Sequence, residues 1–189
     1  FFAMKIKTED LLNDLKEKTS KMITEVEFFK QLSKEELNRK PAEDKWSILE
    51  CIGHLNFYSD FYLIEFESKI SNAKQNTCEY HKTSFLGNRF AKSMLPVGDK
   101  TPMKMKTFKS KKPVQSELSV NTLNKFISQQ KDIILLIDRC RSINITKTKC
   151  RLTIKSIKLR LGDALMFYTF HNVRHIVQAS KILGKNFEF

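Results

Sequence analysis

Apolar residues recur every three to four positions along four long segments of this chain, which is the spacing of helices with one buried face. The chain has 189 residues but only 5 glycines and 4 prolines, too few for the many turns of an all-β fold. The sequence therefore predicts an all-α protein, a four-helix bundle in a single domain. The expected helices cover residues 8–32, 47–70, 116–140 and 161–183.

Short local signals refine these boundaries. Ser33 and Glu36 have the spacing of a capping box, and so do Ser47 and Glu50. Thr8 precedes two acidic residues and is expected to cap the first helix. The stretch SFLGNRFAKSML predicts a short additional helix. The alternating stretch TKCRLTIKSIKLRLG is typical of an extended segment or a short edge strand.

A long connection, residues 75–114, joins the second and third helices and is strongly basic. Nine Lys and Arg lie between Lys82 and Lys112 against one acid, Asp99, which accounts for +8 of the net charge of +13. A solvated connection explains such a run, and an acidic partner would also suit it. Nucleic acid is the least favoured partner, because charge is its only support and no recognition motif accompanies it.

Location and domain limits follow from weaker signals. No apolar run approaches the roughly 20 residues of a membrane span, and no secretory signal is expected at the N-terminus. The four cysteines form no CxxC motif and no close pair, so reduced thiols and a cytoplasmic location are expected. Phe1 to Ala3 precede a methionine and are expected to be left over from a tag. The domain is therefore expected to span residues 4–189.

Two of the four histidines lie on the apolar stripe of the last helix. That stripe runs through Ala164, Tyr168, His171, His175, Gln178 and Ile182. Residues four apart on a helix are neighbours, with Cβ atoms about 6 Å apart. The rings of His171 and His175 could therefore bind one metal ion, or they could form a pair satisfied by hydrogen bonds. Burial of unsatisfied rings would be costly, which favours the metal.

A third histidine occupies the core side of another helix. His54 lies about two turns into the second helix, and packing of the two helices could bring it to the pair on the last one. Three histidines would leave coordination positions open, as in catalytic metal sites. Cys51, one turn earlier, is either a fourth ligand or a small buried side chain, and the second is favoured. His81 lies in the connection and is expected to be solvated.

Four further residues are candidates for supporting roles beside the metal. Glu50 either caps its helix or accepts an imidazole N–H. Tyr58 and Tyr168 share the histidine stripes and are expected to place their hydroxyls near the site. Arg174 points to a neighbouring surface of the helix, where a structural salt bridge is the simpler interpretation.

Three motifs of the chain resemble the DinB-like superfamily. Two carry the histidines, WSILECIGHL in the second helix and LGDALMFYTFHNVRHIVQA in the last, and the third is PMKMKTFKSKKP in the connection. The resemblance covers residues 8–183. It implies a four-helix bundle that binds a divalent metal, Zn²⁺ or Ni²⁺, through His54, His171 and His175. It also implies a homodimer, since dimers are common among similar proteins.

Two activities follow from the resemblance, transfer of a low-molecular-weight thiol and hydrolysis. An open metal site could lower the pKa of a bound thiol or could activate water. The nearest acids, Glu50 and Glu65, are not placed as an obvious general base, which favours the thiol. The basic connection is then expected to recognise an acidic thiol. A non-catalytic metal-binding or stress-response protein is the alternative.

Overall fold

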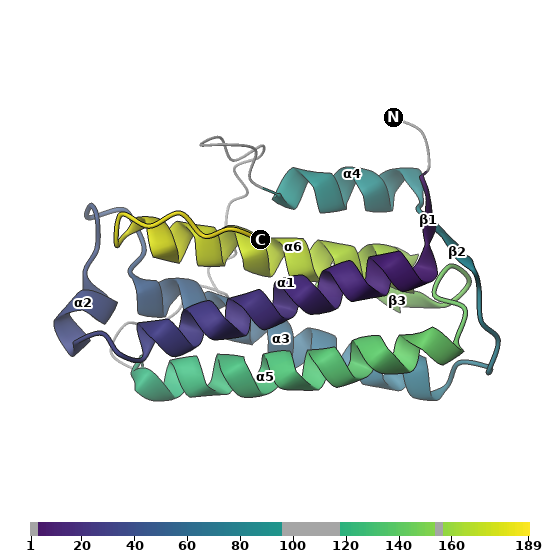
Figure 1. Ribbon diagram of the computed structural model, residues 1–189, viewed down its shortest axis with the longest axis horizontal. Helices are drawn as coiled ribbons and strands as arrows, with labels where there is room; N and C mark the ends of the chain where they lie inside the picture. The colour runs from purple at the N-terminus through teal and green to yellow at the C-terminus, as the bar shows by residue number, and fades with distance from the viewer. Residues whose placement is uncertain (1–3, 96–117, 154–156) are drawn as a thin grey trace.

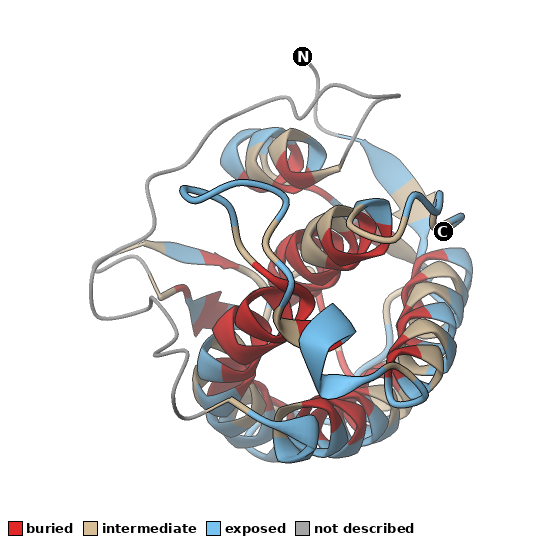
Figure 2. Cartoon of the chain, turned by 90° about the vertical axis from the view of Figure 1, so that its left-hand side faces the viewer, coloured by how far each residue is buried: buried red, intermediate tan, exposed pale blue. Residues whose placement is uncertain are grey.

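Four long helices form the bundle that the sequence predicts (Figure 1). The computed structural model describes residues 4–95, 118–153 and 157–189. The long helices are α1 (Thr8–Phe29), α3 (Ile48–Ser71), α5 (Val120–Arg139) and α6 (Leu161–Lys181). Because α1 and α3 each pack against both α5 and α6, the four helices close into a ring. Buried residues face the inside of this ring (Figure 2).

Short elements connect and cover the bundle. They are the helices α2 (Lys34–Asn38) and α4 (Phe85–Met94) and the antiparallel strand pairs β1 (Lys5–Lys7) with β2 (Tyr80–Lys82) and β3 (Lys149–Arg151) with β4 (Lys158–Arg160). Helix α4 confirms the short helix predicted in the connection, and it lies along α6 (Figure 1). The β3–β4 pair confirms the extended segment and turns it into a hairpin.

Most of the basic residues of the connection lie outside the described residues. Of its nine Lys and Arg, only Lys82, Arg89 and Lys92 are described. The expectation that this connection recognises an acidic thiol therefore stays a prediction.

The core consists of two apolar clusters that meet partway along α6. One is built around Tyr62, Phe66 and Tyr168, and the other around Met22, Phe29 and Phe126. Phe170 belongs to the first cluster and Val173 to the second, so the boundary crosses α6 beside His171. The candidate metal centre thus lies where the two halves of the core join.

A buried polar layer occupies this boundary inside the ring. Ser59 Oγ lies 2.8 Å from the Tyr168 hydroxyl, and Gln130 Nε2 donates to the same hydroxyl at 2.9 Å. Asn172 Nδ2 donates to Gln130 Oε1 at 3.2 Å. Such a network joins α3, α5 and α6 and favours one register of the three helices, because a shift would leave buried polar atoms unpaired.

The helix starts confirm the expected capping boxes and correct one predicted cap. Capping boxes form at the starts of α2 and α3, as expected. At α1 the predicted cap is wrong, because Thr8 lies inside the helix and Lys7 precedes it without a side-chain cap. The Thr8 N–H instead donates to the Glu79 carbonyl at 2.9 Å. Pairing of β1 with β2 thus supplies the acceptor that a capping side chain would have provided.

The expectation that His81 is solvated is wrong, since its side chain is fully buried. Its Nδ1 lies 3.0 Å from Thr146 Oγ1, and its Nε2 lies 3.0 Å from Asp163 Oδ1. Asp163 Oδ2 in turn accepts hydrogen bonds from the backbone N–H and the hydroxyl of Ser84, which caps α4. This network ties β2, α4 and the start of α6 together, and strand pairing with β1 is what carries His81 into it.

All four cysteines are free. Burial raises the pKa of Cys140 and of Cys150 to about 12, so both are protonated thiols near neutral pH. Among the helices of the described ranges, none is long and apolar enough to cross a membrane.

Candidate metal centre

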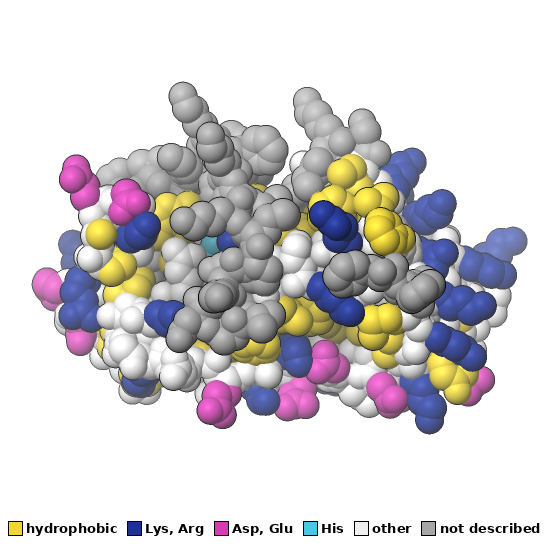
Figure 3. Space-filling view, turned by 90° about the horizontal axis from the view of Figure 1, so that it is seen from above, with side chains coloured by type: hydrophobic (Ala, Val, Ile, Leu, Met, Phe, Trp, Pro, Cys, Tyr) yellow, Lys and Arg dark blue, Asp and Glu magenta, His cyan; other side chains and the backbone are white. Residues whose placement is uncertain are grey.

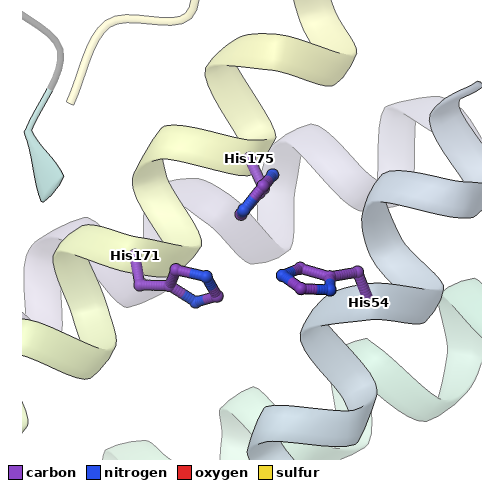
Figure 4. A group of neighbouring side chains, drawn as sticks. All are labelled: His54, His171 and His175. Carbon is purple, nitrogen blue, oxygen red and sulfur yellow. The ribbon is translucent and has the colours of Figure 1, made fainter. Parts of the chain in front are cut away.

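Three histidine rings meet between α3 and α6 (Figure 4). One ligand nitrogen from each of His54, His171 and His175 lies within 4.8 Å of the others. The centroid of the His54 ring lies 5.3 Å from that of the His171 ring and 4.7 Å from that of the His175 ring. The centroids of the His171 and His175 rings are 4.8 Å apart. The structure thus brings together all three histidines that the sequence singled out.

Helix packing produces this convergence. His171 and His175 are one turn apart on the face of α6 that packs on α3, and His54 points from α3 into the gap between them (Figure 4). The Ser47 capping box fixes the start of α3 and therefore the register of His54. His54 is 2% exposed and His171 9% exposed, while His175 is half-buried.

The tautomer of His175 follows from its neighbour one turn ahead. The His175 Nδ1 atom lies 3.0 Å from Gln178 Oε1. An amide oxygen can only accept, so Nδ1 carries the hydrogen and Nε2 keeps a free lone pair. A partner of this kind orients an imidazole for metal binding. Gln178 was on the predicted stripe, but its role became visible only with the geometry.

Electrostatics keep the two α6 histidines neutral. Burial lowers the pKa of His171 well below its ordinary value, and the neighbouring His175, His54 and Arg174 add to the effect. Burial also lowers the pKa of His175 to about 3, with further lowering by His54 and a smaller opposing effect from Gln178. Neutral imidazole is the form that binds metal, so both lone pairs are available near neutral pH.

Aromatic side chains surround the three rings. Trp46 contacts His54 at a centroid distance of 4.8 Å and stacks on His175 at 5.7 Å. Tyr58 contacts His54 at 4.8 Å and His171 at 4.6 Å. Phe167 stacks on His171 at 6.3 Å. The sequence placed Tyr58 near the site, whereas Trp46 entered it only as the first residue of the motif WSILECIGHL.

Glu50 and Tyr168, two of the other candidates for supporting roles, are engaged with other residues. Glu50 Oε2 accepts the Ser47 N–H at 2.8 Å, and Oε1 pairs with Lys40 Nζ at 2.8 Å, so the carboxylate serves the helix cap. The Tyr168 hydroxyl belongs to the buried polar layer inside the four-helix bundle, where it contacts Ser59 and Gln130. Cys51 is fully buried, and burial together with the Glu50 charge raises its pKa. Within the described residues no Asp, Glu or Cys joins the three histidines.

The donor set fits a divalent ion of borderline softness. Three neutral imidazoles suit Zn²⁺, Ni²⁺ and similar ions, whereas Mg²⁺ and Ca²⁺ prefer oxygen. Three protein ligands leave further coordination positions for water or substrate. Trp46, Tyr58 and His175 are partly exposed, whereas His54 and His171 are buried.

Comparison with known proteins identifies the family and supports the fold. The family model described as the DinB superfamily matches residues 24–179. The solved structure of YfiT from Bacillus subtilis is similar to this chain, with 14% sequence identity and a TM-score of 0.52 over 93% of this chain and 85% of that one. YfiT is described as a probable metal-dependent hydrolase with an unusual four-helix bundle topology. None of the curated proteins matches this chain.

Proposed function

Because this chain belongs to the DinB superfamily, we propose that His54, His171 and His175 hold a divalent metal ion and that the protein is a metal-dependent enzyme. The observation that carries the proposal is the convergence of three histidines from two helices, two of them held neutral, on a partly open position. Imidazole ligands suit Zn²⁺ and Ni²⁺ alike, so the proposal covers both ions.

The favoured reaction is transfer of a low-molecular-weight thiol. A divalent ion at such a site lowers the pKa of a bound thiol, which then needs no carboxylate base. The described residues support this choice, because no acid joins the histidines and Glu50 is engaged at its helix cap. In the reaction the thiol proton passes to solvent, the sulfur bonds to an electrophilic carbon, and the leaving group departs with its bonding electron pair.

The chain's own residues would shape this reaction in two ways. Trp46, Tyr58 and Phe167 form an aromatic wall that excludes water from the sulfur. Gln178 holds His175 in the tautomer that directs Nε2 toward the ion. Both effects favour a nucleophile that is poorly hydrated and fixed in position.

Hydrolysis is the second candidate, and the description of YfiT favours it. The same site would then activate a water molecule instead of a thiol. Water and thiol compete for the same coordination positions, so one assay can separate the two activities.

We also propose a cell compartment and an assembly. Four free cysteines fit a reducing compartment, and we propose the cytoplasm. A homodimer is proposed through the groove between α3 and α5, which is lined by Leu63, Ile64, Glu67, Asp132, Leu135, Leu136, Asp138 and Arg139. Ile64 is 74% exposed and Leu135 62% exposed there, and the mixed charges beside them suit a self-complementary surface.

The proposed activity is tested with protein that carries one equivalent of Zn²⁺ or Ni²⁺. The loaded protein is mixed with a panel of small thiols and an activated aryl halide, and separately with an activated ester without thiol. We expect thioether formation in the first mixture and its loss in His171→Ala. Ester cleavage without thioether formation would establish the hydrolase instead. Wild-type protein that retains no metal would overturn both the transferase and the hydrolase proposal.

A further inference from the structure

Helix α6 opens to solvent at one patch, and that patch adjoins the candidate metal centre. In the run from Leu161 to Ser180, only Arg174, His175 and Gln178 are partly exposed. The three are neighbours on the helix surface, because Gln178 lies three residues after His175 and four after Arg174. Figure 3 shows a His side chain beside a Lys or Arg side chain on the face seen from above. Arg174 is thus the charged residue of this partly exposed patch.

Arg174 carries a charge that no group of the described chain neutralises. Its guanidinium has no carboxylate within ion-pair distance among the described residues, although it is half-buried. By contrast, Arg139, Arg141 and Arg151 each pair with a glutamate. Burial lowers the pKa of Arg174, which means that its environment opposes the charge. A half-buried arginine stays protonated, and within residues 4–95, 118–153 and 157–189 no acid offsets the cost of its burial.

The position of Arg174 places this charge close to the ligands. On a helix it lies about 60° around from His171 and about 100° around from His175. The Arg174 charge contributes to the lowered pKa of both histidines. It is therefore within electrostatic reach of both rings, and no carboxylate of the described residues lies within ion-pair distance of its guanidinium.

We propose that Arg174 binds an anionic oxygen group of the substrate, a carboxylate or a phosphate, while the reacting group of the same molecule binds at the three histidines. This inference rests on the proposed metal site. The planar guanidinium fork pairs with either oxygen group through two parallel hydrogen bonds, and such charge-assisted pairs are the strong ones. The pair would fix the substrate at two points and orient its sulfur or its scissile bond relative to the metal.

Binding of paired small thiols to the Zn²⁺-loaded protein tests this role. The anionic probes are mercaptoacetate, 3-mercaptopropionate, 4-mercaptobutyrate and 2-mercaptoethylphosphonate, and the neutral probe is 3-mercapto-1-propanol. At low salt we expect wild type to bind the best anionic probe about 10- to 100-fold more tightly than the neutral one. Arg174→Gln should bind all five probes alike, and Arg174→Lys should keep part of the preference because it keeps the charge.

Arg39→Gln is the matched control, since it also removes one arginine charge but from an exposed side chain that donates to the Ile182 carbonyl. It should keep the full preference. Metal content and circular dichroism are measured for every variant, and Arg174→Lys carries the test if Arg174→Gln does not fold. A preference that survives in Arg174→Gln, or that Arg39→Gln loses equally, would overturn the inference. Stronger binding of the phosphonate than of every carboxylate would identify phosphate as the group.

A second probe pair separates this inference from the proposed thiol chemistry. Hydroxamates bind metal without a thiol, so the monohydroxamate of succinate is compared with its neutral amide. If wild type prefers the anionic hydroxamate but transfers no thiol, the thiol activity is wrong and the role of Arg174 stands. If the protein transfers thiols but shows no anionic preference with either probe class, the role of Arg174 alone is wrong.

Discussion

The Nδ1 atom of His175 lies 3.0 Å from Oε1 of Gln178, and this contact sets which nitrogen faces the metal position. Replacing Gln178 by Ala should therefore weaken metal binding by about 10- to 100-fold without unfolding the protein. Gln178→Glu should bind at least as well as wild type, because a carboxylate also accepts the Nδ1–H. Competition with a metal chelator measures the affinity.

Gln31 offers the control for this substitution, since it is an exposed glutamine after the end of α1. Gln31→Ala should leave the metal affinity unchanged. Equal affinities of Gln178→Ala and wild type would mean that helix packing alone orients His175.

Acid should release the metal and then destabilise the metal-free fold. Because the folded pKa of His175 is lowered to about 3, the unfolded chain takes up a proton first as the pH falls below about 6.5. The stability contributed by neutral His175 is therefore complete above that pH and is lost progressively toward pH 3. Urea unfolding of the metal-free protein between pH 7 and pH 4 measures this slope.

The variant His175→Gln isolates the contribution of this one ring. It should show a shallower fall of unfolding free energy with acid than wild type, since one titrating group is gone. Parallel curves for the two proteins would show that His175 is not held neutral by the fold.

The buried pair of His81 and Asp163 should matter for stability and not for metal binding. His81→Ala removes the partner of a fully buried carboxylate, and breaking such a pair costs about 3 kcal/mol. Chemical denaturation should show this loss, while the folded variant still binds one metal ion. Asp60→Asn, which breaks the exposed pair with Lys125, should cost about 1 kcal/mol or less. A similar small cost for His81→Ala would contradict the structural role.

His81 also shows where the sequence is insufficient. The helices, both capping boxes and the histidine stripe follow rules that act within a few residues, so α3 and α6 could be predicted together with His54, His171 and His175. The burial of His81 depends on the pairing of β1 with β2, across more than 70 residues of chain, and no local pattern encodes it. Trp46 and Gln178 were visible in the sequence, but their contacts with the rings depend on how α3 packs against α6.

The proposed dimer surface predicts a clear change in mass. Ile64 and Leu135 are the most exposed large apolar side chains of the groove between α3 and α5. Replacing both by Asp would place like charges across a two-fold interface, so the double variant should be a monomer with unchanged metal content. Sedimentation velocity distinguishes the two masses. A dimer with a micromolar Kd should be largely formed at a protein concentration on the order of 100 μM. Wild-type protein that is still a monomer at that concentration would contradict the proposal.

Trp46 is the chain's single tryptophan and contacts two of the three candidate ligands, so its fluorescence should report metal binding directly. Binding of Ni²⁺, a quenching ion, should reduce the emission with a stoichiometry of one ion per chain. Zn²⁺ should compete for the same position and restore the emission. His171→Ala keeps both ring contacts of Trp46 but removes a ligand, so the quenching should require much more Ni²⁺. Quenching that is identical in this variant would place the ion elsewhere.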